Sequence, residues 1–302
     1  MEKARVALTT TGSGGFIARG VLETCAREGL GSRALSRGAR PNWVPDAIAW
    51  VTLPSYADQP RLASALAGTR FVLHLADDPA RHGERDPAEA LRVCDALIEA
   101  AREAKVEAII LASSVYARDA RTPYGSSKRA IEDRLLAASD VRTIVLRLPP
   151  VYGPGCKGGF AALAKLVGKG LPLPLGAARA PRAYLSRRNL SSLIVTMAGM
   201  DAARCRAAAG RIFEPSDGQG VATRDLALMM GASLGRTPML LPVPPVLLRA
   251  AGRAIGRADL VRGVVDRLET APATELEAAF GWRPVEQMPE SLAFLPQGFR
   301  PA

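Results

Sequence analysis

The chain has 302 residues, of which 48% are hydrophobic, and its formal net charge is +11. This length and apolar content predict one large domain, or a domain with a small lobe, and exclude a disordered chain. The positive charge comes mainly from scattered arginines, with no run of five and no interleaved aromatic residues. We interpret it as a solvated surface with a few phosphate contacts, and we expect no nucleic-acid partner.

The sequence gives little indication of disulfides, metal sites or membrane spans. The first residues show no signal-peptide pattern, so the widely spaced cysteines predict reduced thiols in a cytoplasmic protein: Cys25, Cys94, Cys156 and Cys205. The two histidines, His74 and His82, are too few for a typical zinc site, and we expect no metal. The longest apolar stretch, 239–255, is interrupted by prolines and an arginine, so we expect no membrane span.

The first predicted strand, 5–10, continues into a Gly-rich turn, residues 11–18, and then into an amphipathic helix that ends near residue 28. A dinucleotide-binding fingerprint requires this order of elements. Gly12 permits the tight turn, and Gly15 lets the backbone approach a pyrophosphate at the helix N-terminus. Ala18 is the third small residue of the fingerprint, at the point where the helix packs on the strand. We therefore predict a dinucleotide-binding site in this turn.

The end of the second predicted strand, 32–37, lacks the acidic residue that would bind a ribose 2′-hydroxyl. The candidates for a contact with the cofactor's ribose at this place are Arg33, Arg37 and Arg40. Arg37 either meets a 2′-phosphate, which favours NADP over NAD, or is simply exposed, and the sequence leaves both readings open.

Strands and helices then alternate with the spacing of a parallel, doubly wound sheet. His74 falls in an apolar strand and is interpreted as a packed residue. The predicted strands cover 47–53, 70–76, 107–114 and 142–148, and the predicted helices cover 58–66, 86–105 and 124–139.

From Pro149 onward the chain is rich in helices and in proline-containing connections. We predict an NAD(P)-binding Rossmann domain over 1–175, with its core ending near 153. A smaller substrate-binding lobe covers most of 176–302, and 186–200 packs back on the first domain. The helices predicted in this half cover 160–170, 189–200, 223–234 and 246–255.

The candidate chemistry lies between Ser113 and Lys128. Tyr124 and Lys128 are four residues apart at the start of a predicted helix, so they share one face. An ammonium beside a phenol favours its ionised form, and such a pair suits proton transfer. A serine at the end of the preceding strand can donate to the same oxygen. Ser114 fits the strand end better, and Ser113 is the alternative.

Several motifs together resemble an extended short-chain dehydrogenase/reductase of the NAD-dependent epimerase/dehydratase group, which acts on nucleotide-activated sugars. The segment 213–284 is similar to bacterial 4-epimerases of polysaccharide pathways. The motifs that carry the resemblance are residues 11–17, His74-Leu75-Ala76, Ser113-Ser114, Pro123 to Lys128, Arg147 to Gly155, Arg182 to Leu185 before Asn189-Leu190, and Gly281 to Pro284.

The resemblance implies a role for each matching residue. Tyr124 is the general acid/base, Lys128 binds the nicotinamide ribose and tunes Tyr124, and Ser114 orients the substrate hydroxyl. The expected cofactor contacts are Gly12, Ser13, Gly15, Phe16, Ile17, Arg37, Leu75, Ala76, Tyr124, Lys128, Pro150 and Val151. The expected substrate contacts are Ser114, Tyr124, Phe160 and Arg182, with Arg182 on the diphosphate. A homodimer through the helices at 86–105 and 124–139 is also implied.

The sequence departs from the family pattern at four places. Ala90 stands where a supporting Asn is usual, and Gly159 replaces an Asn before Phe160. The loop from Ser114 to Tyr124 is short. Val115 and Tyr116 follow Ser114 where dehydratases carry an Asp-Glu pair, which argues against dehydration. Three functions are open: a sugar-nucleotide 4-epimerase, an NADPH-dependent reductase of a keto sugar or another carbonyl, and a cofactor-binding scaffold or sensor with little turnover.

Overall fold

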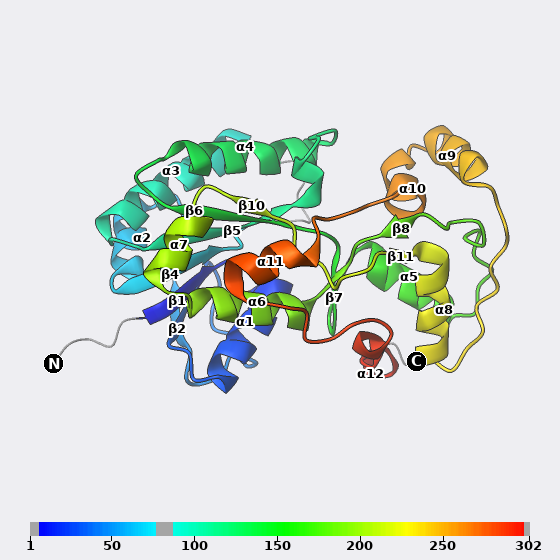
Figure 1. The fold of residues 1–302 in the computed structure, drawn as a ribbon, viewed down its shortest axis with the longest axis horizontal. Helices are drawn as coiled ribbons and strands as arrows, with labels where there is room; N and C mark the ends of the chain where they lie inside the picture. The colour runs from blue at the N-terminus through cyan, green and yellow to red at the C-terminus, as the bar shows by residue number, and fades with distance from the viewer. Residues whose placement is uncertain (1–5, 77–86, 299–302) are drawn as a thin grey trace. The chain divides into compact units, whose positions relative to one another are not determined.

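The computed structural model describes residues 6–76 and 87–298 (Figure 1). His82 and the first residue of the helix predicted over 86–105 lie outside them. Backbone contacts divide the chain into two compact units, each built from three segments. The first unit contains Met1–Leu148, Leu190–Pro215 and Pro272–Arg283, and the second contains Pro149–Asn189, Ser216–Ala271 and Pro284–Ala302.

The first unit is built around a parallel sheet of seven strands in the order β10-β6-β5-β4-β1-β2-β3. The order reverses between β1 and β4, as in a doubly wound Rossmann sheet, so the predicted fold class is confirmed. The strands are β1 Val6–Thr11, β2 Ser32–Ser36, β3 Ala49–Thr52, β4 Thr69–His74, β5 Ala108–Ser114, β6 Thr143–Leu148 and β10 Ile212–Phe213.

The central strands are buried on both faces. Every residue of β5 and β6 is buried, which requires helices on both sides of the sheet. In Figure 1, α2, α3 and α4 cover one face, where their apolar residues join one core cluster, and α1 and α6 cover the other. The helices of this unit are α1 Phe16–Arg27, α2 Gln59–Leu66, α3 Pro87–Glu103, α4 Pro123–Ala137, α7 Ala202–Ala208, α11 Ala273–Phe280 and most of α6 Arg187–Ala198.

The second unit is rich in helices and contains two small strand pairs. β7 pairs with β9 in parallel, and β8 pairs with β11 in antiparallel fashion. Helix α5 packs on α8, and α9 packs on α10. Its elements are β7 Val151–Tyr152, α5 Gly159–Gly168, β8 Pro181–Arg182, β9 Leu185–Ser186, β11 Val221–Ala222, α8 Thr223–Ser233, α9 Pro245–Ala254, α10 Ala258–Val265 and α12 Leu295–Gly298.

Within these described residues, no helix is both long and apolar enough to cross a membrane.

Candidate cofactor and catalytic site

The Gly-rich turn follows β1 and packs directly on the chain that leaves β4. Gly12 has φ +68°, and a Cβ built on it would lie 2.9 Å from the backbone of Leu75 and Ala76. Thr11 reinforces this contact, because its hydroxyl accepts the amides of both residues at 3.2 and 3.3 Å. It also pairs with Nδ1 of His74 at 2.9 Å, so this buried histidine is a structural residue of β4. Only glycine fits at position 12.

A buried phenol that the sequence analysis missed holds the same turn. The hydroxyl of Tyr56 accepts the amide of Gly12 at 2.7 Å and donates to the carbonyl of Leu35, the fourth residue of β2, at 2.8 Å. The amide of Ser13 donates to that carbonyl as well, at 3.1 Å. Burial raises the pKa of Tyr56, so its proton stays available for donation. Tyr56 lies in the connection between β3 and α2, where no motif marks it.

The turn ends at a helix terminus suited to an anion. Gly15 caps α1 without a side-chain hydrogen bond, and the first turn carries no acidic residue. The N–H groups of the first helical turn and the helix dipole therefore offer a positive end, next to Gly14 and Gly15, which are exposed. Phe16 and Ile17 are half-buried at the start of the helix. This donor set and the absence of side chains at Gly14 and Gly15 fit a pyrophosphate.

The three arginines near the end of β2 differ in what they contact. Arg33 donates to the carbonyls of Ala65 and Ala67, at the end of α2. Arg40 donates to carbonyls of the loop before β3. Arg37 is exposed, and no hydrogen bond or ion pair engages it within the described chain. Of the three, it is the one whose guanidinium is available to a ligand.

Tyr124 and Lys128 lie one turn apart at the start of α4, as predicted from their spacing. Thr122 caps the helix by accepting the amide of Gly125 at 3.0 Å. The ammonium of Lys128 lies 6.0 Å from the centre of the Tyr124 ring. Lys128 is buried, and it donates to the carbonyl of Ala112 in β5 at 3.3 Å. The lysine is therefore anchored on the strand beneath the helix.

The two candidate serines have different surroundings. Ser113 donates to the carboxylate of Glu132 at 2.5 Å, and this fully buried carboxylate forms an ion pair with Arg147 at 2.6 Å. The Ser114 hydroxyl accepts the amide of Tyr116 at 3.4 Å, and among the described residues nothing accepts its proton. Ser114 thus keeps a donor for a ligand, which favours it over Ser113.

Glu132 and Arg147 were not predicted as part of this region. Tyr124, Lys128 and Glu132 follow one another at intervals of four residues, so they share the face of α4 that meets β5. This four-residue spacing was the signal in the sequence that could have identified Glu132. The ion pair of Glu132 with Arg147 joins α4 to β6, next to the strand that carries both serines.

The short loop before Tyr124 has a defined structure. Its first residues form a 3-10 turn, Val115–Ala117, and the edge of the Tyr116 ring meets the Tyr124 ring at 6.5 Å between centroids. The hydroxyl of Ser126 donates to the carbonyl of Ala120 at 2.8 Å and ties the loop to α4. The loop is therefore held on the first turn of the helix that carries Tyr124.

Two positions where the family usually has an Asn have other roles here. Ala90 lies on α3 and packs against the apolar cluster between the helices and the sheet. Gly159 begins α5, and a Cβ built on it would meet no atom within 4 Å. Neither position supplies a polar side chain.

The second unit contains the other predicted ligand contacts. Pro150 and Val151 are half-buried at β7. Phe160 is buried and stacks on Tyr152 at 4.7 Å, with Tyr184 on its edge at 6.3 Å. Arg182 is also buried.

The guanidinium of Arg182 contacts the end of α10. Its Nη1 donates to the carbonyls of Arg262 and Asp266. Its Nε is buried and has no partner within the described residues. An unpartnered buried donor on an arginine is costly, so a ligand oxygen there would be stabilising.

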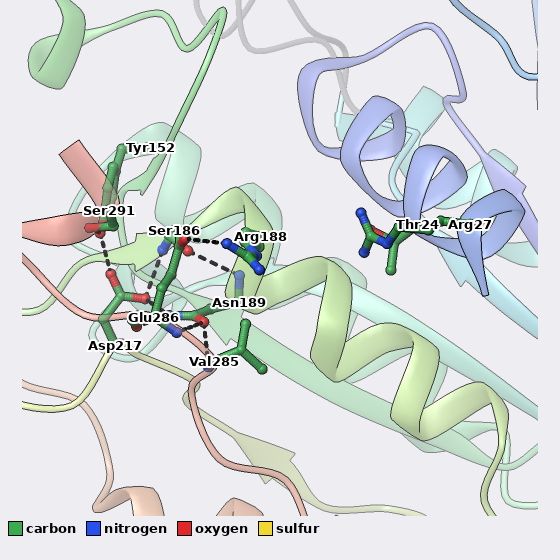
Figure 2. A network of polar contacts seen from close by, with 10 residues as sticks. All are labelled: Thr24, Arg27, Tyr152, Ser186, Arg188, Asn189, Asp217, Val285, Glu286 and Ser291. Atoms are coloured by element: carbon green, nitrogen blue, oxygen red, sulfur yellow. Dashed lines mark hydrogen bonds and ion pairs between the residues drawn. The ribbon is translucent and has the colours of Figure 1, made fainter. Parts of the chain in front are cut away.

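A polar network centred on Asp217 holds this part of the second unit together (Figure 2). Its carboxylate accepts the Tyr152 hydroxyl at 2.7 Å, the Asn189 amide at 2.7 Å and the backbone amide of Ser186 at 2.8 Å. Burial raises the pKa of Asp217 despite these donors. Because Phe160 stacks on Tyr152, the network also fixes Phe160.

Asn189 extends this network to the C-terminal segment. Its side-chain carbonyl accepts the amides of Val285 and Glu286 at 2.8 and 3.1 Å, and its amide donates to the carbonyl of Glu286 at 2.8 Å. Ser291 pairs with the Tyr152 hydroxyl at 2.5 Å. The resemblance marked Asn189 only as a motif position, and its structural role follows from these contacts.

The sheet order defines a Rossmann-type fold, and the glycine turn at α1 and the Tyr124–Lys128 pair agree with the pattern of an extended short-chain dehydrogenase/reductase. The sequence model of the NAD dependent epimerase/dehydratase family matches residues 8–203. The chain belongs to this family, and it is an NAD(P)-dependent enzyme.

Individual relatives carry more than one activity. The chain is 33% identical to UDP-glucose 4-epimerase of Vibrio cholerae over 180 residues, 58% of this chain and 53% of that protein. It is 28% identical to ceramide reductase of Caulobacter vibrioides, over 83% of this chain and 78% of that protein. The structure of Thermus thermophilus UDP-glucose 4-epimerase in complex with NAD shares the fold, with TM-score 0.72, 23% identity, and 98% and 99% of the two chains covered. The match to the Vibrio protein thus spans about half of that protein's length.

Proposed function

We propose that the chain is an NAD(P)-dependent 4-epimerase of a nucleotide-activated sugar. The observation that carries the proposal is the arrangement of Tyr124 above a buried Lys128 anchored on β5, with Ser114 at the end of the same strand. Membership of the epimerase/dehydratase family and the likeness to a UDP-glucose 4-epimerase support it.

In this proposal Tyr124 is the acid/base. Its phenolate takes the proton of the C4 hydroxyl as that carbon is oxidised to a ketone, and it returns the proton when the opposite face is reduced. The cofactor, when bound, supplies the hydride acceptor and donor. Ser114 donates to the same substrate oxygen, and Lys128, whose ammonium lies 6.0 Å from the centre of the Tyr124 ring, binds the nicotinamide ribose. No net oxidation results, because the proton and the hydride removed from the sugar both return to it.

The residues after Ser114 disfavour dehydration. Val115 is buried and apolar, and Tyr116 packs against Tyr124, so neither of the two residues after Ser114 offers a carboxylate to remove a second proton from the sugar. An epimerase needs only one proton relay at C4.

Arg182 and Phe160 are the proposed substrate contacts from the second unit. Arg182 would use its unpartnered Nε toward a diphosphate oxygen, and Phe160, held by Tyr152, would contact the substrate. For the cofactor, the free guanidinium of Arg37 and the lack of an acid at the end of β2 favour NADP over NAD.

The test is incubation of purified protein with hexose and N-acetylhexosamine derivatives of UDP and a catalytic amount of NAD or NADP. We expect a C4 epimer of at least one of them, measured by NMR, with no net change in cofactor absorbance at 340 nm. If no C4 epimer forms from any of them, the proposal is wrong.

A second candidate is an NADPH-dependent reductase of a carbonyl substrate. Arg37 and the similarity to ceramide reductase favour it. The same Tyr124 would donate a proton to the carbonyl oxygen. Consumption of NADPH in proportion to product distinguishes this activity from epimerisation, in which the cofactor is regenerated.

A further inference from the structure

Helix α9, Pro245–Ala254, exposes an apolar face. Val246, Leu247 and Ile255, the residue that ends the helix, are 70%, 59% and 71% exposed. At 100° per residue, these three and the exposed alanines form one uncharged arc of about 180°. The alanines are Ala250, Ala251 and Ala254. A helix on a water-facing surface normally has the opposite pattern, with polar residues outward.

The other side of α9 is used for packing. Gly252 is its buried residue, and a Cβ there would lie 2.5 Å from the side chain of Val261 in α10. The missing side chain lets the two helices approach closely, side by side in Figure 1. The core contact thus uses the face opposite the exposed arc, and nothing among the described residues covers that arc.

Positive charge borders the apolar arc. Helix α9 carries no acidic residue. Arg253 lies at one edge of the arc, and Arg257 follows the helix; both are exposed and neither has an acidic partner in the described chain. The two acids nearby are already paired, Asp266 with Arg249 at 2.7 Å and Asp259 with Arg262. The surface is therefore apolar in the middle and cationic at its border.

We propose that α9 binds the surface of an anionic phospholipid bilayer. A helix of ten residues is about 15 Å long and cannot span a membrane, but it can lie in the interface with its apolar arc among the acyl chains. Arg253 and Arg257 then meet lipid phosphates. Pairing of this face with a second copy would instead set unpaired positive charges against the same charges, because a twofold interface brings equal patches together.

The proposal is tested by flotation of the full chain with vesicles of phosphatidylcholine alone and with phosphatidylglycerol added at one third. We expect binding to the anionic vesicles and little to the neutral ones. Leu247→Glu/Ile255→Glu should abolish binding. Arg253→Gln/Arg257→Gln should lower the partition coefficient about 25-fold, since each arginine near an anionic surface contributes roughly a fivefold factor.

The matched control is Lys105→Gln/Arg206→Gln, which removes the same charge from exposed sites of the first unit and should change the partition coefficient less than threefold. Thermal unfolding verifies that every variant is folded. Equal binding to neutral and anionic vesicles, or no binding to either, overturns the proposal. So does a dimer in light scattering that Leu247→Glu converts to a monomer, because the arc would then be a protein interface.

Discussion

The carbonyl oxygen of Tyr116 occupies the place where a side chain on Gly125 would begin: a Cβ there would lie 2.2 Å from it. Gly125 directly follows Tyr124, and Tyr116 belongs to the short loop after Ser114. The close approach lets that loop fold directly onto the helix. The glycine thus couples the proposed proton donor to the loop that shapes its surroundings.

Gly125→Ala should displace the loop or the first turn of α4. We expect a loss of about 1–3 kcal/mol in the free energy of unfolding, measured by urea denaturation, because the backbone must move to admit the methyl group. Turnover should fall more than stability alone explains. Gly263→Ala is the control, since a Cβ in that part of α10 meets no atom within 4 Å. If both variants have wild-type stability, the contact does not constrain the loop.

Tyr124→Phe should lower kcat by roughly 100- to 10,000-fold, because it removes the proposed general acid/base. Cofactor affinity should change less than kcat, because Tyr124 is one of several expected cofactor contacts. Tyr116→Phe is the matched control: this tyrosine lies 6.5 Å from Tyr124 between ring centres and has no lysine one turn on. Steady-state rates and fluorescence titration of the cofactor measure both effects. If Tyr116→Phe lost more kcat than Tyr124→Phe, the acid/base role would belong to Tyr116 instead of Tyr124.

Arg37→Ser should weaken binding of NADPH and leave NADH almost unchanged. Loss of a hydrogen bond to a charged phosphate predicts a rise in Kd of roughly 10- to 100-fold. Calorimetric titration measures both cofactors. Arg206→Ser on α7 controls for the general loss of positive charge. An equal effect on NADH and NADPH would show that Arg37 does not recognise a 2′-phosphate.

Asp217→Asn should change how stability depends on pH. Burial raises the pKa of Asp217 above its ordinary value of 3.8, so the folded chain holds this proton more tightly than the unfolded chain. That contribution is fully present below the unfolded pKa and is lost as the pH rises through the folded pKa. The Tm of the wild type should therefore fall relative to the Asn variant from about pH 4 toward neutrality.

Asp201 provides the control of opposite sign. It caps α7, and its hydrogen bond from the amide of Arg204 lowers its pKa. Its contribution is present above the unfolded pKa and is lost as the pH falls through the folded pKa. The Tm of the wild type relative to Asp201→Asn should therefore rise with pH. If the difference in Tm between the wild type and the variant changed with pH in the same direction for Asp201→Asn and Asp217→Asn, the assignment for Asp217 would be contradicted.

The sequence predicted the elements with strong local patterns. The apolar strands and the Gly-rich turn determined the Rossmann sheet, and the spacing of Tyr124 and Lys128 placed both on one helical face. Strand β10 was missed because two residues carry no periodicity, and it exists only through its pairing with β6. Helix α10 was missed because a connection of three residues separates it from α9.

Contacts between distant segments were not predictable from local patterns. Tyr56 contacts Gly12, which is 44 residues away in the sequence, and Glu132 contacts Ser113, which is 19 residues away. Such pairs are set by the folded sheet, and a single sequence gives no measure of them. The choice between Ser113 and Ser114 also required the structure, because it depends on the Glu132 carboxylate.

The hydroxyl of Tyr56 bridges two backbone groups, the amide of Gly12 and the carbonyl of Leu35. These hydrogen bonds hold the glycine turn in one shape within the protein itself, so the proposed dinucleotide site is preorganised. A preorganised loop loses little conformational entropy on association, so more of the interaction energy with the pyrophosphate appears as affinity. The same hydrogen bonds also make the turn rigid. A turn held by a buried phenol cannot change its shape to fit a ligand of a different size.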